Sequence, residues 1–211
     1  AGRAAGGGEM PVSIPIVLLA AASCIPYYYK YEKKKPQTRE HVVLAVMTAL
    51  TVISRMIFAP VPGFKPVAAM VMICGMAFGR ESGFLCGSLS AFVSNFFFGQ
   101  GPWTPFQMIA WGSIGWFSGM LNRTGQMEKR RIRTAVFGIL AGIWYSLVMN
   151  LWVVIGAGEG LEWIRYGAVF ITSLPVTAEY CVSNVLFLWI LVPGFMKRLN
   201  RVKYKYGFFE F

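Results

Sequence analysis

Few side chains in this 211-residue sequence are suited to chemistry, and their types exclude many reactions. Hydrophobic residues make up 56% of the chain and charged residues 14%, and all nine acidic residues are glutamates. Without aspartate, most carboxylate pairs used in catalysis and most calcium sites lack their ligands. Arg55 and Glu179 are the charged residues expected within the membrane, and a charge in hydrocarbon is costly enough to indicate a functional site.

Amide, aromatic and cationic side chains accompany these two residues and favour small-molecule binding. The candidate substrate-binding residues are Arg55, Lys65, Asn95, Gln100, Trp103, Gln107, Tyr145, Asn150 and Glu179. Ligand sites combine apolar walls with a few polar groups that orient the ligand, and this set provides both. Two alternatives stay open. Single Asn and Gln side chains also hold helices together by hydrogen bonds, and Arg55 and Glu179 also suit an ion pair with each other.

No metal, cofactor or catalytic motif is recognisable in the sequence. The four cysteines lie in apolar stretches without a C-x-x-C pair, so we expect neither a zinc site nor a disulfide framework. No G-x-x-x-x-G-K-[ST], H-E-x-x-H or G-x-S-x-G motif occurs. We therefore expect no cofactor, no metal and no enzymatic activity in this chain. The nearest catalytic alternative is a membrane-embedded enzyme that uses Glu179 with Ser183 one helical turn later.

Seven apolar stretches must position these groups, and they are separated by breaks rich in Pro, Gly or charge. They cover residues 11–29, 41–59, 64–79, 83–98, 105–121, 134–156 and 166–195. A helix needs roughly 20 residues to cross the hydrocarbon core, so we expect each stretch to be a span. Pro175 should kink or divide the last one, which is too long for a perpendicular helix. The predicted fold class is an all-α membrane protein, with a six-helix core and one extra N-terminal transmembrane helix.

The positive charge sets the orientation of these spans. Of the 20 lysines and arginines, 15 fall in three segments, at 30–40, at 122–133 and in the C-terminal tail. Because basic residues concentrate in cytoplasmic loops, this distribution predicts an outward N-terminus and a cytoplasmic C-terminus. The same topology places most of the candidate polar residues in the outer half of the membrane. The net charge of +11 therefore indicates orientation and contact with membrane lipid, and we expect no nucleic-acid partner.

Five regions follow from this topology. They are a Gly/Ala-rich linker at 1–10, an extra transmembrane helix at 11–29, a basic cytoplasmic loop at 30–40, a six-span substrate-binding core at 41–195 and a basic cytoplasmic tail at 196–211. The linker and its outward position suggest an extracellular domain ahead of it.

Two alanines one helical turn apart give the first core helix a small-residue face. Ala45 and Ala49 lie in its inner half, and Arg55 is about 120° away from Ala49 round the helix. Small residues let another helix approach closely. The alanine face is therefore a candidate interface with a partner protein, while Arg55 faces a pocket.

The segment Ala45-Val-Met-Thr-Ala49 is similar to the A-x-x-x-A motif of the substrate-specific (S) components of energy-coupling factor (ECF) transporters. The runs Gly83-Phe-Leu-Cys-Gly87 and Ser94-Asn-Phe-Phe-Phe-Gly-Gln-Gly-Pro-Trp-Thr-Pro-Phe-Gln-Met108 look like the corresponding stretch of vitamin-type members. The resemblance covers about residues 40–195. The extra N-terminal span departs from the usual six-helix pattern.

The resemblance implies a function in the bacterial cell membrane. S components capture a vitamin or a related micronutrient at the outer face of the membrane. They deliver it inward together with a transmembrane coupling protein and two cytoplasmic ATPases, as one kind of ABC importer. Carried over, Ala45 and Ala49 face the coupling protein, and the loops Pro60 to Lys65 and 99–104 cover the pocket. A corrinoid such as cobalamin is the candidate substrate. The alternatives are a stand-alone ion-coupled permease and a membrane scaffold protein.

Overall fold

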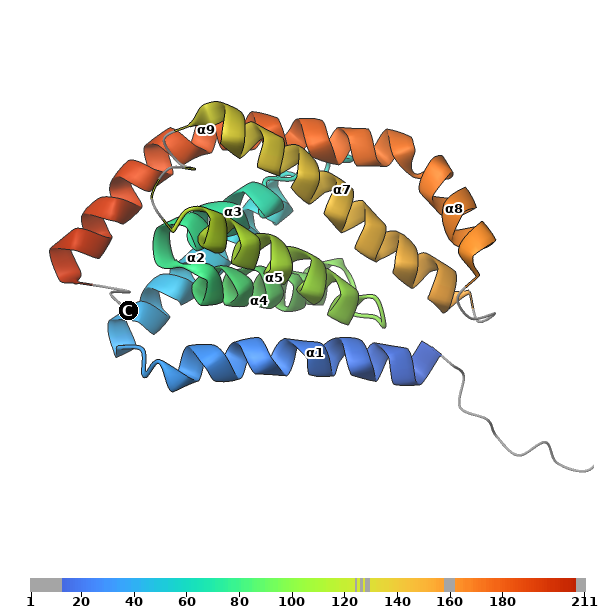
Figure 1. The fold of residues 1–211 in the computed structure, drawn as a ribbon, viewed down its shortest axis with the longest axis horizontal. Helices are drawn as coiled ribbons and strands as arrows, with labels where there is room; N and C mark the ends of the chain where they lie inside the picture. Colours follow the sequence, from blue (N-terminus) through green and yellow to red (C-terminus); the bar gives the residue numbers. More distant parts are fainter. Residues whose placement is uncertain (1–12, 124, 126, 128–129, 158–161, 208–211) are drawn as a thin grey trace, which may run out of the picture.

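The computed structural model is all-helical over the residues that it describes, 13–123, 125, 127, 130–157 and 162–207 (Figure 1). Its helices are α1 (Ser13–Lys33), α2 (Thr38–Ile57), α3 (Val67–Phe78), α4 (Arg80–Phe98), α5 (Thr104–Leu121), α7 (Arg131–Gly156), α8 (Trp163–Thr172) and α9 (Leu174–Tyr206). No strand occurs in the described ranges, so the predicted all-α class is confirmed. The predicted linker at 1–10 lies outside the described residues.

Three of the described helices, α2, α7 and α9, are long and apolar enough to cross a membrane. Helix α3 has 12 residues, all of them buried, and rises about 18 Å, which is less than the ~30 Å hydrocarbon core. It is the buried centre of the bundle rather than a full span. The protein is thus an all-α membrane protein, and the number of crossings stays a prediction.

Proline and glycine divide the chain where the sequence indicated. Helix α8 ends at Thr172 and α9 begins at Leu174, with Pro175 in its first turn, so the predicted division of the last apolar stretch is confirmed. Gly79, between α3 and α4, has a φ of +91°, a conformation that other residues rarely adopt. Helices α1 and α9 extend further into the basic segments than expected, because Lys and Arg are good helix formers.

Glycines let α4 and α5 pack almost backbone to backbone. A Cβ on Gly83 would collide with the carbonyl oxygen of Gly115, and a Cβ on Gly87 would collide with the carbonyl oxygen of Trp111. Helix α1 lies along the outside of this pair (Figure 1), where Tyr27 stacks on Phe84 with 3.9 Å between ring centroids. The close approach of α4 and α5 fixes the relative position of the polar side chains that they carry.

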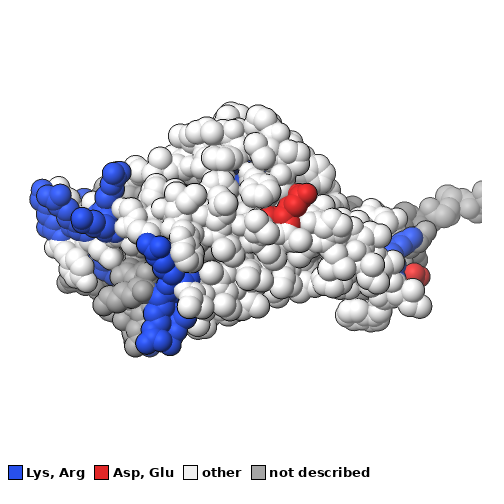
Figure 2. All heavy atoms as spheres, turned by 90° about the horizontal axis from the view of Figure 1, so that it is seen from above, with Lys and Arg blue, Asp and Glu red and all other residues white. Residues whose placement is uncertain are grey.

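Charged side chains lie mainly at one end of the elongated molecule. Figure 2 shows lysines and arginines gathered at the end where α9 finishes, and no lysine or arginine gathers in this way across the middle of the same face, where an acidic side chain lies. We call the end of the molecule that carries Lys34, Arg80, Arg123 and Lys203 the basic end. The candidate polar residues lie along the helices away from it, as described next.

Candidate functional site

A continuous hydrogen-bond network joins four helices and one loop. Asn95 of α4 is its centre, because its Nδ2 donates to Thr104 Oγ1 at 3.0 Å and to Gln107 Oε1 at 2.8 Å. Gln107 Nε2 in turn donates to the Tyr145 hydroxyl of α7 at 3.1 Å. Thr104 Oγ1 donates to Gln100 Oε1 at 3.0 Å. Four predicted residues, Asn95, Gln100, Gln107 and Tyr145, thus meet in one network.

Arg55 of α2 joins the same network through neutral partners. Its Nη1 donates to Asn95 Oδ1 at 2.9 Å and also to Ser94 Oγ. The side chain is buried, and its Nε has no hydrogen-bond partner. Among the described residues no carboxylate forms an ion pair with Arg55. A buried cation with a free donor is costly, so this position is suited to a ligand that brings an acceptor.

Aromatic rings surround the Arg55 guanidinium. Its central carbon lies 4.5 Å from the centroid of Phe98 and 4.9 Å from that of Trp111. Trp111 stacks on Tyr145 at 5.5 Å with an interplanar angle of 12°, and Tyr180 meets Tyr145 edge-on at 5.3 Å. Cation–π contacts stabilise the guanidinium without neutralising it. The rings also provide a flat apolar wall beside the polar network.

A small cavity of about 60 Å³ opens beside these groups. Its lining residues are Arg55, Lys65, Val67, Ala68, Trp111, Gly142, Tyr145, Tyr180 and Asn184. The loop between α2 and α3 closes one side, where Lys65 N donates to Ser183 Oγ of α9 at 3.1 Å. Burial, with a smaller contribution from Arg55, lowers the pKa of the Lys65 amine. The cavity thus combines two cations, three aromatic rings and an amide.

Comparison with known proteins identifies the family of the chain. The family model described as "ECF-type riboflavin transporter, S component" matches residues 35–200. The chain belongs to this family. Neither the curated proteins nor the solved structures contain a significant match. As an S component, the chain is a substrate-binding subunit of a transporter, and S components are not themselves ATPases.

Three of the predicted substrate-binding residues of this S component lie apart from both the network and the cavity. Asn150 Nδ2 donates to Ser173 Oγ at 2.7 Å and so ties α7 to the joint between α8 and α9. The Trp103 ring packs over Gly101 at the start of α5. Glu179 is exposed and lies against Gly63. The alternative of an ion pair between Glu179 and Arg55 is wrong, because Arg55 is bound by neutral side chains instead.

The alanine face of α2 is exposed and differs from the face that carries Arg55 toward the cavity. Ala45 and Ala49 are exposed, as are the neighbouring Val46 and Ile53, whereas Arg55 is 7% exposed. The two functions that the sequence assigned to this helix are therefore geometrically compatible. One face is available to a partner, and the other carries the cation of the cavity.

Sequence reasoning missed several residues of the S component's site, among them Ser94, Phe98 and Tyr180. Ser94 precedes Asn95 by one residue and shares its guanidinium partner. Tyr180 follows Glu179, whose charge is the stronger signal in the sequence although its side chain is exposed. A turn-by-turn count of aromatic residues at the depth of Arg55 would have found Phe98 and Tyr180.

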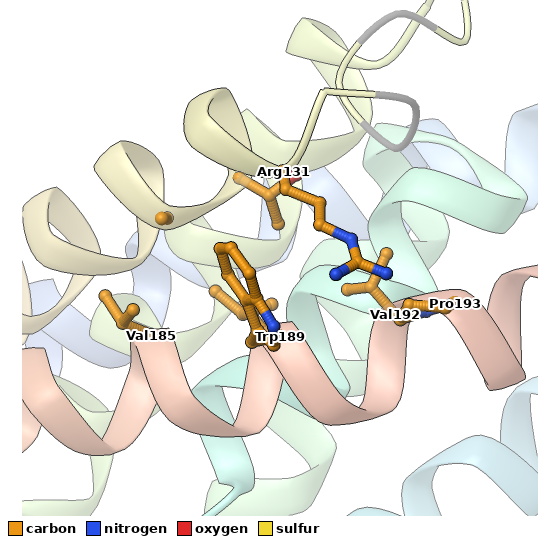
Figure 3. Close-up of a pocket in the computed structure, with 8 residues that line it drawn as sticks. Arg131, Val185, Trp189, Val192 and Pro193 are labelled. Atoms are coloured by element: carbon orange, nitrogen blue, oxygen red, sulfur yellow. The ribbon is translucent and has the colours of Figure 1, made fainter.

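Another hollow lies between α7 and α9, closer to the basic end (Figure 3). Arg131 reaches over Trp189, with 5.1 Å between its guanidinium carbon and the ring centroid. The remaining lining is mostly aliphatic and includes Val185, Val192 and Pro193. This hollow shares no lining residue with the cavity at Arg55, so it is separate from the candidate substrate site.

Proposed function

We propose that this S component binds a flavin in the cavity beside Arg55. The family model names riboflavin, and a flavin combines a flat ring system with carbonyl acceptors. The stacked pair Trp111 and Tyr145 suits the ring system, and the donors of Arg55 suit the acceptors. The observation that carries the proposal is the buried Arg55, with a free Nε and neutral partners.

Ligand entry requires the site to open. The cavity of about 60 Å³ is much smaller than the roughly 300–1,000 Å³ of ordinary ligand pockets. The loop from Phe58 to Pro66 is the element suited to move, because it contributes Lys65 to the cavity lining. It contacts α9 through the hydrogen bond between Lys65 and Ser183 and through packing of Gly63 against Glu179. We expect this loop to shift outward when the substrate enters and to close over it.

Equilibrium binding to the purified protein tests the substrate. Riboflavin fluorescence should be quenched on titration with protein, because the bound ring system stacks on Trp111 and Tyr145. Cobalamin in a parallel titration tests the corrinoid predicted from the resemblance, which stays a prediction and which no contact in the cavity favours. Saturable quenching supports a flavin substrate. Binding of cobalamin without riboflavin would overturn this proposal in favour of the earlier prediction.

The alanine face supports docking of the coupling protein. Ala45 and Ala49 are exposed small residues on one of the three helices suited to span the membrane, and small residues permit close helix contact. In this proposal two ATPases act from the cytoplasm through the coupling protein. The basic end faces the cytoplasm, following the positive-inside rule, and the N-terminus is outside.

Substitution of one alanine tests this docking surface. Ala49→Phe should leave riboflavin affinity within twofold of the wild type and abolish ATP-dependent uptake by the assembled transporter. Ala168→Phe is the control, because Ala168 is also an exposed alanine but lies on α8. Normal uptake by Ala49→Phe would remove this face from the interface. Uptake by the isolated chain under an ion gradient would favour a stand-alone permease.

A further inference from the structure

A second concentration of cationic side chains surrounds a hollow of about 350 Å³ at the basic end. Its charged lining residues are Lys34, Arg80, Glu81, Arg123 and Lys203. Lys34 follows α1, Arg80 and Glu81 open α4, Arg123 follows α5, and Lys203 lies near the end of α9. Four separate parts of the chain therefore direct charge toward one hollow, which shares no lining residue with the substrate cavity.

Positive charge exceeds negative charge in this hollow. Of the described residues that line it, four are cationic and Glu81 is the single acid, which leaves an excess of three positive charges. Glu81 accepts from Lys34 Nζ at 3.1 Å and from Arg80 Nε at 2.9 Å. Its carboxylate is thus already shared between these two cations. In the part of the chain that the structure describes, neither Arg123 nor Lys203 forms an ion pair with a carboxylate.

The shape of the hollow also suits an anion. Lys203 Nζ donates to the carbonyl oxygen of Ala77 at 3.3 Å, which holds the ammonium group at the rim. Gly79 lies in the lining, and a Cβ added to it would meet no atom within 4 Å. Space at this point is therefore open.

We propose that this hollow binds a phosphate group, either from an anionic phospholipid head group or from a soluble phosphate. Arg and Lys are the usual phosphate partners, and charge-assisted hydrogen bonds make these contacts strong. In the orientation proposed above, the hollow faces the cytoplasm at the level of the lipid head groups. Basic pockets between transmembrane helices on that side are typical sites for anionic head groups. The site is distinct from the substrate cavity and does not depend on its ligand.

Two binding measurements on the purified full chain distinguish the sources of the phosphate. Native mass spectrometry compares retention of dioleoyl phosphatidylglycerol with that of dioleoyl phosphatidylcholine, and calorimetry measures binding of inorganic phosphate. The double variant Arg123→Gln/Lys203→Gln removes two cations of the hollow. At about 1 kcal/mol for each basic residue near the lipid surface, it should weaken binding about thirtyfold.

A control variant separates this site from general attraction to a basic protein. Arg198→Gln/Lys205→Gln removes two exposed charges of α9 that do not line the hollow, and binding should change less than twofold. Because Lys203 also holds α9 to α3, Arg123→Gln alone serves as a second variant. Arg123 is exposed, so folding should persist, with binding about fivefold weaker.

Preferential retention of phosphatidylglycerol that the double variant loses and the control keeps would support a lipid head-group site. Binding of inorganic phosphate with the same dependence, without a lipid preference, would support the site with a soluble ligand. Equal retention of both lipids together with no phosphate binding would overturn the proposal. Equal losses in the double and control variants would also overturn it.

Discussion

Two arginines of this protein are stabilised in contrasting ways. Arg80 at the basic end is exposed and lies 2.9 Å from the carboxylate of Glu81. Arg55 is buried and is held by Ser94, Asn95 and two aromatic rings, with its Nε left without a partner. An exposed ion pair contributes little to stability because water screens both charges. A buried cation with only neutral partners and an unpaired donor is costly, and a hydrogen-bond acceptor on a ligand would reduce that cost.

The contrast indicates which region is built for substrate. At the basic end, a carboxylate already satisfies part of the charge, and the remaining cations are open to solvent and lipid. In the substrate cavity, the protein supplies donors and aromatic surface but no negative group. The same kind of substitution should therefore change riboflavin affinity strongly around Arg55 and only slightly around Glu81.

The largest effect should come from Arg55→Gln. Loss of a charge-assisted hydrogen bond costs roughly 1.5–3 kcal/mol, so riboflavin should bind about 100-fold more weakly in fluorescence titrations. Arg80→Gln is the matched control and should change the Kd less than twofold. Equal affinities for the two variants would remove the distinction between the two regions.

Gly115→Ala should destabilise the packing of α5 on α4, which holds the hydrogen-bond network in position. The added Cβ would meet the carbonyl group of Gly83 and push α5 away from α4, which stretches the hydrogen bond between Asn95 and Gln107. We expect a loss of about 1–3 kcal/mol in the free energy of unfolding, as for other overpacked cores. Thermal unfolding in detergent measures it.

Gly194→Ala provides the comparison for this substitution. A Cβ at Gly194 of α9 meets no atom within 4 Å, and alanine favours a helix over glycine by roughly 1 kcal/mol. Its unfolding temperature should therefore stay the same or rise. A similar decrease in both variants would show that close packing of α4 on α5 is not what positions the network.

Tyr145→Phe should have a moderate effect on binding. It removes the acceptor of Gln107 Nε2 and keeps the ring that stacks on Trp111. An unpaired buried donor costs roughly 1–3 kcal/mol, and riboflavin affinity should fall about tenfold. Tyr166→Phe removes a hydroxyl that donates to Leu147 O, outside the network, and should leave the affinity unchanged. A tenfold loss in both would contradict a specific role for Tyr145.

Glu81→Gln should have the smallest effect. The variant loses two partly exposed ion pairs, which together contribute about 1 kcal/mol or less to stability. Riboflavin binding should not change, and phosphate or phosphatidylglycerol should bind more tightly because the competing carboxylate is gone. A fall in riboflavin affinity would show that the two regions are coupled.

Much of the architecture was predictable because hydrophobicity and charge specify it directly. Long apolar stretches separated by Pro, Gly and basic residues indicate helices in a membrane whatever their tertiary contacts. Pro175 divides the last stretch as predicted. The shortness of α3 was not predictable from its composition, since an apolar run of 16 residues suits either a short buried helix or part of a span.

The candidate site was only partly predictable. Arg55, Asn95, Gln100, Gln107 and Tyr145 were identified by type and depth, which is sufficient when polar groups are rare. Depth does not determine the direction in which a side chain points round its helix. The Asn150 side chain bonds to Ser173 instead of joining the network, and Glu179 lies exposed. The pairing of Arg55 with neutral groups depends on the packing of α2 on α4, which a single sequence does not encode visibly.

An experimental structure of the full chain with bound riboflavin tests the central claim most directly. We predict that the flavin ring system lies against Trp111 and Tyr145, with one of its acceptors within hydrogen-bond distance of Arg55 and with the loop from Phe58 to Pro66 displaced. Riboflavin bound elsewhere, such as in the hollow between Arg131 and Trp189, with Arg55 still bound only to Ser94 and Asn95, would contradict the assignment of the site.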